Sequence, residues 1–397
     1  MSVNGVAGIR LAATSAGIRY RDRADLVLIE LAEQGSCAAV FTRNAFCAAP
    51  VVVAREHLEQ GPPRYLLINA GNANAGTGET GLRAARETCR LVADTAGCAL
   101  TQVLPFSTGV IGEDLPLDPF VQAVPGLLGG LDGANWDAAA VAIMTTDTVP
   151  KQVEHQVELT AGRVTIRGIA KGAGMICPDM ATMLAFCATD AAVPDAVLQT
   201  VLIDAVADSF NAITIDGDTS TNDACVLMAS GASGITVDAL DSADGQRFAA
   251  AVRRVCLDLA EQIVRDGEGA TKLVRIRVDE AADRDEARQV AYAVAHSPLV
   301  KTALFAGDPN WGRILAAVGR AGLDALAIDS VRIWLDDVSI VRDGGRNPEY
   351  TEAAGQAVMA RDELVLRIAL GRGAASVEIM TCDLSYDYVK INAEYRS

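Results

Sequence analysis

Short apolar runs and helical stripes alternate along the whole chain. Runs rich in valine, isoleucine and leucine predict buried strands, and apolar residues spaced three to four positions apart predict amphipathic helices. The expected strands are residues 25–31, 50–54, 65–69, 273–278, 331–335, 364–370 and 376–380. The expected helices are residues 82–96, 193–210 and 248–263. Because both kinds of element occur along the length of the chain, the pattern indicates an α+β fold.

The clearest helix and a candidate boundary lie in the C-terminal half. The helix has an apolar stripe formed by Phe248, Val252, Val255, Leu259 and Ile263. Asp266-Gly267 follows and is expected to end the helix, since glycine is a common residue just after a helix C-terminus. A cluster of charged residues at 279–288 is the candidate boundary of a C-terminal lobe that spans about 280–397.

Composition and charge narrow the class of protein. The chain has 397 residues, of which 50% are hydrophobic and 21% are charged, as in ordinary globular proteins. That length allows two domains or one large interleaved core. The net charge of −17 repels phosphate groups, so neither nucleic acid nor an anionic membrane is an expected partner. The longest uncharged run, 95–112, is too polar to span a bilayer, and residues 1–11 lack a signal-peptide pattern, so we expect a cytoplasmic protein.

Cysteine and histidine give little support for the common catalytic and metal sites. The nine cysteines are scattered and form no CxxC pair, which indicates reduced thiols and neither a disulfide framework nor a zinc ribbon. The three histidines, His57, His155 and His296, are each expected to be structural, with His57 on a solvated helix or turn. No HExxH, GxSxG or P-loop motif occurs, so neither a metal site nor these classes of catalytic site are expected.

One unusual stretch remains, at 171–184 (KGAGMICPDMATML). Lysine followed by Gly-Ala-Gly could form a phosphate-binding loop, but the rest of that motif is missing. Composition alone favours a glycine-rich turn before a strand at 182–189. In a third interpretation, cleavage of the Ala181–Thr182 bond frees Thr182 as a nucleophile. A threonine hydroxyl needs an adjacent base, and the new α-amine, with a pKa of roughly 7.7–8.0, supplies one. A nucleophilic Cys177 is disfavoured because no histidine accompanies it.

Several motifs, in order along the chain, resemble one known family. Besides 171–184 they are 41–44 (FTRN), 69–74 (NAGNAN), 107–112 (STGVIG), 144–148 (MTTDT), 216–223 (DGDTSTND), 266–270 (DGEGA), 297–302 (SPLVKT), 308–313 (DPNWGR) and 388–397. The chain resembles the glutamate N-acetyltransferase / ornithine acetyltransferase family of arginine biosynthesis over essentially its whole length. So many ordered motifs are far more specific than any one of them.

The resemblance implies a precursor that cleaves itself between Ala181 and Thr182. The products are an α chain, residues 1–181, and a β chain, residues 182–397, which form one interleaved core and pair into an α2β2 heterotetramer. The implied fold resembles the N-terminal-nucleophile hydrolases. Stacked β-sheets are expected between helices, with a connectivity of their own, together with a smaller α/β C-terminal lobe.

The implied reaction transfers acetyl from N2-acetylornithine to glutamate. Thr182 takes the acetyl group, ornithine leaves and glutamate then receives the acetyl group, which is a ping-pong route. The resemblance places the oxyanion hole at Thr108 and Gly109. It places substrate binding at Thr145, Lys171, Thr182, Glu268, Asn392 and Ser397. From charge alone, we expect the lysine to bind the substrate carboxylate and the glutamate to bind the ornithine ammonium.

Alternatives for the function remain open at this point. No phosphate-binding motif shows whether acetyl-CoA is a second acetyl donor, and no cofactor is otherwise expected. A self-cleaving N-terminal-threonine amidohydrolase or aminopeptidase would pass the acyl group to water. An uncleaved chain would bind a metabolite without catalysis.

The implied site residues can also be interpreted as purely structural. Glu268 follows a helix end, where a glutamate in a glycine turn is usually solvated. In the same structural interpretation, Thr108-Gly109 is a simple turn, Lys171 is a surface lysine and Asn392 is an edge residue of a terminal strand.

Overall fold

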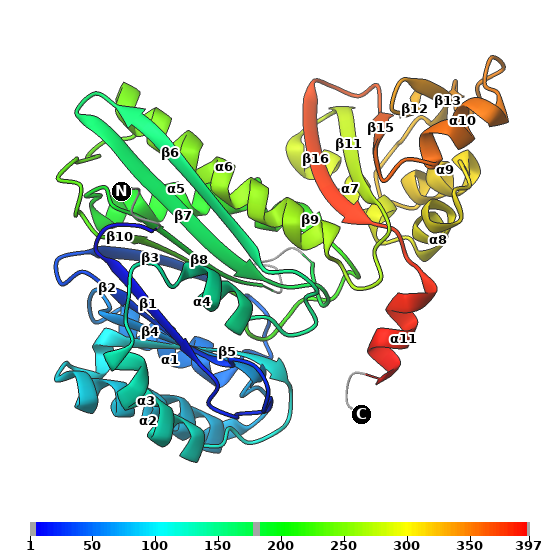
Figure 1. The fold of residues 1–397 in the computed structure, drawn as a ribbon. Helices are drawn as coiled ribbons and strands as arrows, with labels where there is room; N and C mark the ends of the chain where they lie inside the picture. Colours follow the sequence, from blue (N-terminus) through cyan, green and yellow to red (C-terminus); the bar gives the residue numbers. More distant parts are fainter. Residues whose placement is uncertain (1–4, 178–182, 395–397) are drawn as a thin grey trace. The chain divides into compact units, whose positions relative to one another are not determined.

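The computed structural model describes residues 5–177 and 183–394 (Figure 1). Residues 1–4, 178–182 and 395–397 are outside the described part of the chain. The fold divides into two compact units, each described by itself. The first comprises Met1–Asn211 and Asp218–Ile263, and the second comprises Ala212–Gly217 and Val264–Ser397.

The first unit contains two β-sheets. The four-stranded sheet has the order β1-β2-β4-β5, with β1 (Ile9–Thr14), β2 (Leu26–Leu31), β4 (Tyr65–Asn72) and β5 (Val103–Val110). The five-stranded sheet has the order β3-β10-β8-β7-β6, with β3 (Ser36–Phe41), β10 (Ala224–Ala229), β8 (Leu184–Thr189), β7 (Gly162–Lys171) and β6 (Lys151–Leu159). Neighbouring strands are antiparallel except for the parallel pairs β4–β5 and β8–β10.

The two sheets stack on each other and share one hydrophobic core. Ile29 and Leu66 from the four-stranded sheet and Val226 from the five-stranded sheet belong to the same buried cluster. Phe106 on β5 and Phe186 on β8 meet edge to face across the layers, with ring centroids 5.1 Å apart. This burial is the main free-energy source that holds the layers together.

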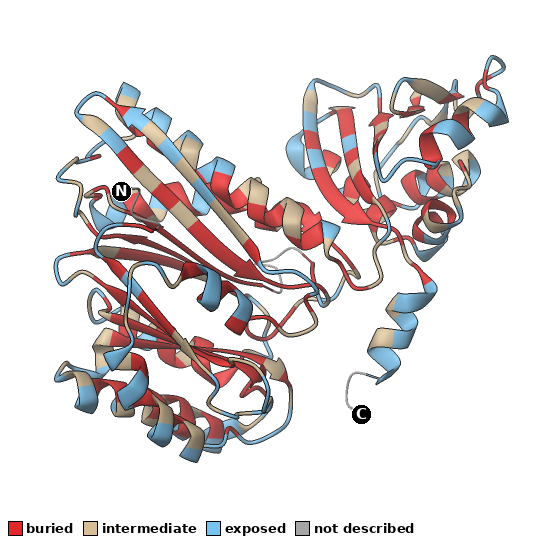
Figure 2. Ribbon diagram, viewed as in Figure 1, coloured by how far each residue is buried: buried red, intermediate tan, exposed pale blue. Residues whose placement is uncertain are grey.

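Helices cover the outer faces of the two sheets. The four-stranded sheet packs with α1 (Ala49–Leu58), α2 (Gly78–Ala96) and α3 (Asp118–Gly129), and the five-stranded sheet with α5 (Asp195–Ala207) and α6 (Ala243–Arg265) (Figure 1). The short helix α4 (Trp136–Ala142) is different, since it contacts strands of both sheets and contributes to the core that they share. Buried residues concentrate in the strands and on the inner helix faces (Figure 2). The predicted stacked sheets between helices are confirmed.

The second unit is a smaller α/β lobe around a seven-stranded sheet. Its strand order is β14-β13-β12-β15-β11-β16-β9, with β9 (Ile213–Thr214), β11 (Leu273–Ala281), β12 (Arg332–Leu335), β13 (Val338–Arg342), β14 (Gly345–Arg346), β15 (Glu363–Ala369) and β16 (Ala375–Cys382). Its helices are α7 (Arg284–Ala295), α8 (Pro298–Ala306), α9 (Trp311–Gly319), α10 (Glu352–Met359) and α11 (Tyr386–Glu394).

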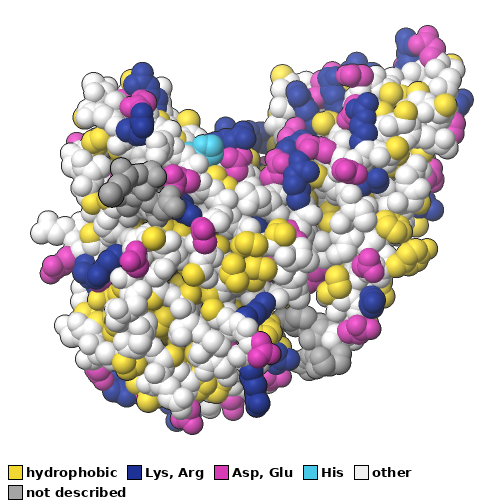
Figure 3. Space-filling model, viewed as in Figure 1, with side chains coloured by type: hydrophobic (Ala, Val, Ile, Leu, Met, Phe, Trp, Pro, Cys, Tyr) yellow, Lys and Arg dark blue, Asp and Glu magenta, His cyan; other side chains and the backbone are white. Residues whose placement is uncertain are grey.

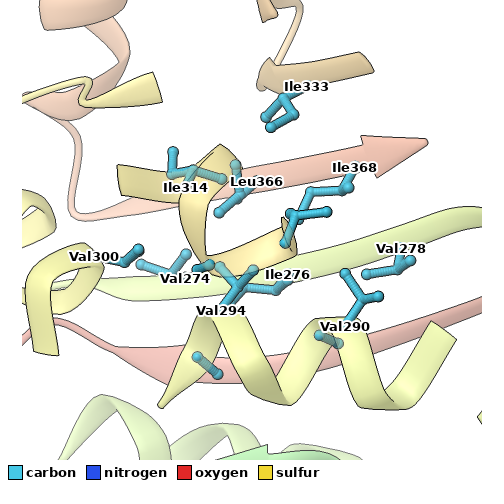
Figure 4. Close-up of a cluster of buried hydrophobic side chains, with 14 of the residues drawn as sticks. Val274, Ile276, Val278, Val290, Val294, Val300, Ile314, Ile333, Leu366 and Ile368 are labelled. Carbon is cyan, nitrogen blue, oxygen red and sulfur yellow. The ribbon is translucent and has the colours of Figure 1, made fainter. Parts of the chain in front are cut away.

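The core of this lobe forms where helices cover the sheet. Val290 and Val294 of α7 face Ile276 of β11 and Leu366 of β15 (Figure 4). Because β11 pairs with both β15 and β16, the lobe includes residues before 280, and its long segment begins at Val264. The expected lobe at about 280–397 lies within this unit.

One predicted strand is wrong. Residues 50–54 belong to helix α1, which begins after an extended Ala48 and has Pro50 in its first turn. Proline has no N–H to lose there, and its fixed φ suits the start of a helix. His57 on the same helix is buried and not solvated, and its Nδ1 lies 2.7 Å from the carbonyl oxygen of Val103.

The cysteines agree with the sequence-based expectation of reduced thiols. All nine cysteines lie in the described part of the chain, and each is a free thiol. Acidic and basic side chains are interspersed on the face seen in Figure 3. Some such side chains pair, as do Arg86 and Glu56 at 2.8 Å. Within the described ranges, no helix has the length and apolar character needed to cross a bilayer.

Candidate active site

The predicted oxyanion residues lie at the end of β5. Thr108 is buried, and Gly109 has a φ of 132°, which residues with side chains rarely adopt. A Cβ at Gly109 would lie 2.2 Å from the carbonyl carbon of Gly71, so the backbones of β4 and β5 approach very closely. The pairing register also shifts at Asn72. Irregular strand ends of this kind leave backbone groups outside the regular hydrogen-bond ladder. Thr108 and Gly109 therefore belong to a distorted strand end, and the interpretation of them as a simple turn is wrong.

A buried ionic cluster surrounds Lys171, the last residue of β7. Oδ1 of Asp147 accepts hydrogen bonds from Lys151 Nζ at 2.6 Å and from the Gly172 N–H at 2.7 Å. Oδ2 of Asp147 accepts the N–H of Thr145 at 3.0 Å. Asp147 therefore fixes the two segments that carry Thr145 and Lys171. Lys171 is itself buried, so the interpretation of it as a surface lysine is wrong.

The neighbouring cations decide the ionisation of Asp147. Burial raises the pKa of this carboxyl, but Lys171, Lys151 and the Gly172 N–H outweigh burial and lower the pKa to about 2. Asp147 is thus a carboxylate at neutral pH. Counted at their formal charges, Lys171, Lys151 and Asp147 sum to one positive charge.

The dipeptide Asn222-Asp223, just before β10, connects the two sheets at this place. The side-chain amide of Asn222 donates to the Ser107 carbonyl at 2.9 Å and to the Ala73 carbonyl at 2.7 Å, which holds the ends of β5 and β4. The carboxyl of Asp223 accepts the N–H of Met183. Met183 directly follows the predicted nucleophile in the sequence. The dipeptide therefore links the candidate oxyanion strand to the start of β8.

Asp223 differs sharply from Asp147 in its ionisation. Its side chain is buried, and burial raises its pKa well above the ordinary value. The Ser220 hydroxyl, the Met183 N–H and Lys171 offset that rise only in part. The environment therefore favours the protonated carboxyl of Asp223 and the ionised carboxyl of Asp147.

In the second unit, Glu268 and Asn392 meet. Glu268 lies in the turn after α6 and is buried, and the amide of Asn392 on α11 donates to Glu268 Oε2 at 2.7 Å. A Cβ at Gly269 would lie 2.5 Å from the backbone nitrogen of Tyr388, so the turn and the start of α11 are in close contact. Two expectations are corrected by these contacts. Glu268 is not solvated, and Asn392 lies on a helix and not in a terminal strand.

The remaining predicted site residues are Ala181, Thr182 and Ser397, and all three lie outside the described residues. The cleavage bond, the nucleophile and the role of the C-terminal serine therefore stay predictions. Of the predicted residues that the structure describes, Thr108, Gly109, Thr145 and Lys171 belong to the first unit, and Glu268 and Asn392 to the second.

Comparison with known proteins decides the family. The ArgJ family model matches residues 10–397 of this chain. The chain belongs to the ArgJ family. It is 60% identical over 392 residues to the arginine biosynthesis bifunctional protein ArgJ of Methylococcus capsulatus, a match that covers 99% of this chain and 96% of the relative. The protein of the same name from Pseudomonas fluorescens is 52% identical over 395 residues, covering 99% of this chain and 97% of that one.

Crystal structures of ArgJ relatives are also similar in sequence. The arginine biosynthesis bifunctional protein ArgJ from Bacillus halodurans is 38% identical, with a TM-score of 0.49, over 51% of this chain and 95% of that one. The ornithine acetyltransferase from Mycobacterium tuberculosis, solved with ornithine, is 36% identical, with a TM-score of 0.41, over 45% of this chain and 96% of that one. The ArgJ resemblance inferred from the motifs is confirmed by the family match.

Three residues at the candidate site of this ArgJ chain were missed by the sequence analysis. They are Asp147, Asn222 and Asp223. All three occur in motifs that carry the resemblance, 144–148 and 216–223, where a charged or amide side chain among small hydroxyl residues was the available signal. Within the described residues, no group of three or more histidine, cysteine, aspartate or glutamate side chains is arranged to hold a metal ion.

Proposed function

We propose that this chain is an acetyltransferase of arginine biosynthesis that transfers acetyl from N2-acetylornithine to glutamate. The match to the ArgJ family over residues 10–397 carries the proposal, and the curated relatives are named as arginine biosynthesis proteins. The same match favours transfer to an amine over the amidohydrolase alternative, in which the acyl group passes to water.

The reaction begins at Thr182. Its hydroxyl attacks the acetyl carbonyl carbon of N2-acetylornithine, and its α-amine takes the hydroxyl proton. Negative charge then develops on the acetyl oxygen, where donors at Thr108 and Gly109 stabilise it. One donor of this kind contributes about 3–4 kcal/mol in a protease. The amide C–N bond breaks, the proton passes to the leaving nitrogen and ornithine departs.

The second half-reaction reverses these roles. The amine of glutamate attacks the acetyl carbon of acetyl-Thr182, the ester C–O bond breaks, and the threonine oxygen recovers a proton from the attacking amine. The free nucleophile is thereby restored, and N-acetylglutamate is released. Both half-reactions use the same oxyanion donors, which is economical because the same type of tetrahedral intermediate forms in each.

Charge supports the assignment of the binding residues. The cluster of Lys171, Lys151 and Asp147 has one net positive charge, which suits the α-carboxylate that acetylornithine and glutamate share. Glu268 is held by Asn392 and keeps acceptor capacity for the side-chain ammonium of ornithine. Thr145 and Ser397 complete the proposed set.

A second acetyl donor is the first finer feature of the proposal. We propose that acetyl-CoA also acetylates the enzyme, and the word bifunctional in the names of the two curated relatives supports a second activity. Release of free thiol from acetyl-CoA in the presence of glutamate tests this feature. The absence of thiol release, beside normal acetylornithine turnover, would leave only the first activity.

Assembly and location are further parts of the proposal. We propose that the two chains remain together and pair as an α2β2 heterotetramer in the cytoplasm. The nine free thiols support a reducing compartment. Sedimentation of the cleaved protein measures the assembly directly.

The denatured mass of purified protein tests the nucleophile. Division of the 41.5 kDa chain at the predicted bond yields fragments of about 19 and 23 kDa. We expect these two fragments in the wild type, one intact chain without transfer activity in Thr182→Ala, and normal cleavage in the control Thr200→Ala, whose hydroxyl bonds to a carbonyl within helix α5. An intact Thr182→Ala chain that still transfers acetyl groups would refute the mechanism.

A further inference from the structure

Self-cleavage and acetyl transfer place different demands on the base. In the mature enzyme, the α-amine of Thr182 is available to take the hydroxyl proton. In the precursor, the same nitrogen belongs to the Ala181–Thr182 peptide bond and is not basic. The proposed function therefore leaves the precursor without the base that it assigns to the mature enzyme, and another group must move the proton during cleavage.

Asp223 is placed beside the residue that follows this bond. Its carboxyl accepts the N–H of Met183 and the hydroxyl of Ser220, and the side chain is only 1% exposed. Met183 is also buried, and its carbonyl accepts the N–H of Ala224, so the start of β8 is fixed against the start of β10. The carboxyl thus contacts the backbone N–H of Met183, the residue that follows the predicted nucleophile in the sequence.

One carboxyl oxygen of Asp223 makes no hydrogen bond with the described residues. Among the described residues, three buried side-chain polar atoms have no hydrogen-bond partner, and Asp223 Oδ2 is one of them. A buried acceptor or hydroxyl without a partner is unfavourable, because it has lost its hydrogen bonds to water and gained none in the protein. An unpaired buried oxygen beside the predicted cleavage site therefore calls for an explanation, and a role in proton transfer is one.

Among the described residues, the other titratable groups near Asp223 have contacts of their own. Lys171, at the end of β7, and the half-buried Cys47, before α1, lie close enough to Asp223 to interact with it electrostatically. Lys171 belongs to the cluster around Asp147. The histidines contact other groups, since His57 meets the Val103 carbonyl and His155 meets Asp258.

We propose that the Asp223 carboxyl moves the proton that self-cleavage between Ala181 and Thr182 requires. Oγ of Thr182 bonds to the carbonyl carbon of Ala181. At the same time, the unprotonated oxygen of the Asp223 side-chain carboxyl takes the proton of the Thr182 hydroxyl. The hydroxyl of the Asp223 carboxyl gives its own proton to the Thr182 nitrogen as the C–N bond breaks. The carboxyl ends neutral with its two oxygens exchanged, and the chain is joined through an ester.

Water then completes the cleavage. It adds to the ester carbonyl, and the bond to Oγ breaks, which leaves a carboxylic acid at Ala181 and restores the hydroxyl of Thr182. The freed α-amine is the base of the transfer reaction. The inference rests on the proposed function, and it gives Asp223 a role in maturation that is separate from the transfer step.

The two steps should respond to pH in opposite ways. Cleavage needs the protonated carboxyl, and burial raises the pKa of Asp223, so cleavage slows as the pH rises through that raised pKa. Transfer needs the free amine, so it accelerates as the pH rises through roughly 7.7–8.0. A structural role for Asp223 would produce no such pair of profiles.

The test follows the intact chain made by cell-free translation. After synthesis is stopped, samples are diluted into buffers from acidic to alkaline pH, and loss of the 41.5 kDa chain is followed by mass. The variants are Asp223→Asn, Asp223→Glu and the control Asp190→Asn. Asp190 is a half-buried carboxyl just after β8 that accepts the Thr165 N–H at 2.8 Å and also has a raised pKa because of burial.

We expect wild-type cleavage to slow with rising pH, and Asp223→Asn to cleave roughly 10²–10⁴-fold more slowly, without that pH profile. Asp223→Glu should recover part of the rate, and Asp190→Asn should cleave like the wild type. Wild-type cleavage by a folded Asp223→Asn chain would overturn the proposal. If that variant does not fold, the wild-type profile decides, and a flat or rising profile overturns it.

The Thr182→Ala variant distinguishes refutation of the role of Asp223 from refutation of the proposed function. An uncut Thr182→Ala chain beside a normally cut Asp223→Asn chain would refute only the role of Asp223. Normal cleavage of Thr182→Ala would instead refute the nucleophile.

Discussion

Replacing Asp147 with asparagine removes the carboxylate that accompanies Lys151 inside the first unit. The two side chains are 0% and 1% exposed and meet at 2.6 Å. An ammonium left in such a place without its carboxylate costs about 3–5 kcal/mol, because its buried charge loses the ion-pair partner that compensates for desolvation. We expect the free energy of unfolding of Asp147→Asn to fall by about that amount at pH 7.

The pKa of Asp147 accounts for part of this magnitude. A fall from the ordinary 3.8 to about 2 corresponds to about 2 kcal/mol. The folded pKa lies below the unfolded one, so this stabilisation is fully present above about pH 4 and is lost as the pH falls toward 2. The remainder is the cost of donors left without an acceptor, since the single asparagine oxygen cannot accept all three hydrogen bonds that the two carboxylate oxygens accept from Lys151, Gly172 and Thr145.

Urea unfolding followed by circular dichroism measures the loss, and hydrogen exchange of β6 and β7 peptides locates it. The matched control is Asp137→Asn, since Asp137 pairs with Arg167 at 3.0 Å but its side chain is 78% exposed. Such a surface pair contributes about 0–1 kcal/mol. Asp147→Asn combined with Lys151→Met should lose less than the sum of the two single variants. Equal losses in Asp147→Asn and Asp137→Asn would refute the reasoning.

Two further predictions concern the candidate site. Gly109→Ala should abolish most acetyl transfer, because its Cβ would lie 2.2 Å from the backbone of Gly71. The control Gly112→Ala, with a positive φ of 84° but no atom within 4 Å, should cost only about 1 kcal/mol of stability. Steady-state kinetics and urea unfolding of both variants test this, and an active Gly109→Ala enzyme would contradict it. Glu268→Gln should raise the KM for acetylornithine about tenfold or more and leave that for glutamate almost unchanged, because only ornithine carries the extra ammonium; equal effects on both substrates would remove Glu268 from this role.

Periodicity was a good guide where an element is long. The stripe at 248–263 falls within α6, and the stripe at 82–96 falls within α2, because a helical period repeated over several turns has few alternatives. The valine run at 51–53 is too short to show any period, and β-branched residues favour strands on composition alone. Tertiary packing placed it in α1, where Val51 and Val53 are buried.

The site could be located from the sequence only as a set of motifs. Glu268 and Asn392 are 124 positions apart, and no local pattern predicts their 2.7 Å hydrogen bond. Glu268 is buried because of that contact and the close approach of α11. The expectation of a solvated glutamate was wrong because it could not take account of contacts between residues far apart in the sequence. Lys171 is similar, since its burial depends on segments far along the chain.

The ionisation of Asp147 and Asp223 differs in a way that could not be predicted from the sequence. Both are aspartates in short motifs of small polar residues, and both are buried. Asp147 has two lysines and two backbone N–H groups around it, which favour the anion. Asp223 has one lysine, one backbone N–H and one hydroxyl, which do not compensate for its desolvation. Neighbouring carboxyls with pKa values pushed apart are characteristic of sites that need one fixed charge and one mobile proton. Lys171 interacts electrostatically with both carboxyls. In the mechanism that we propose, binding of a substrate carboxylate and movement of a proton therefore use different groups.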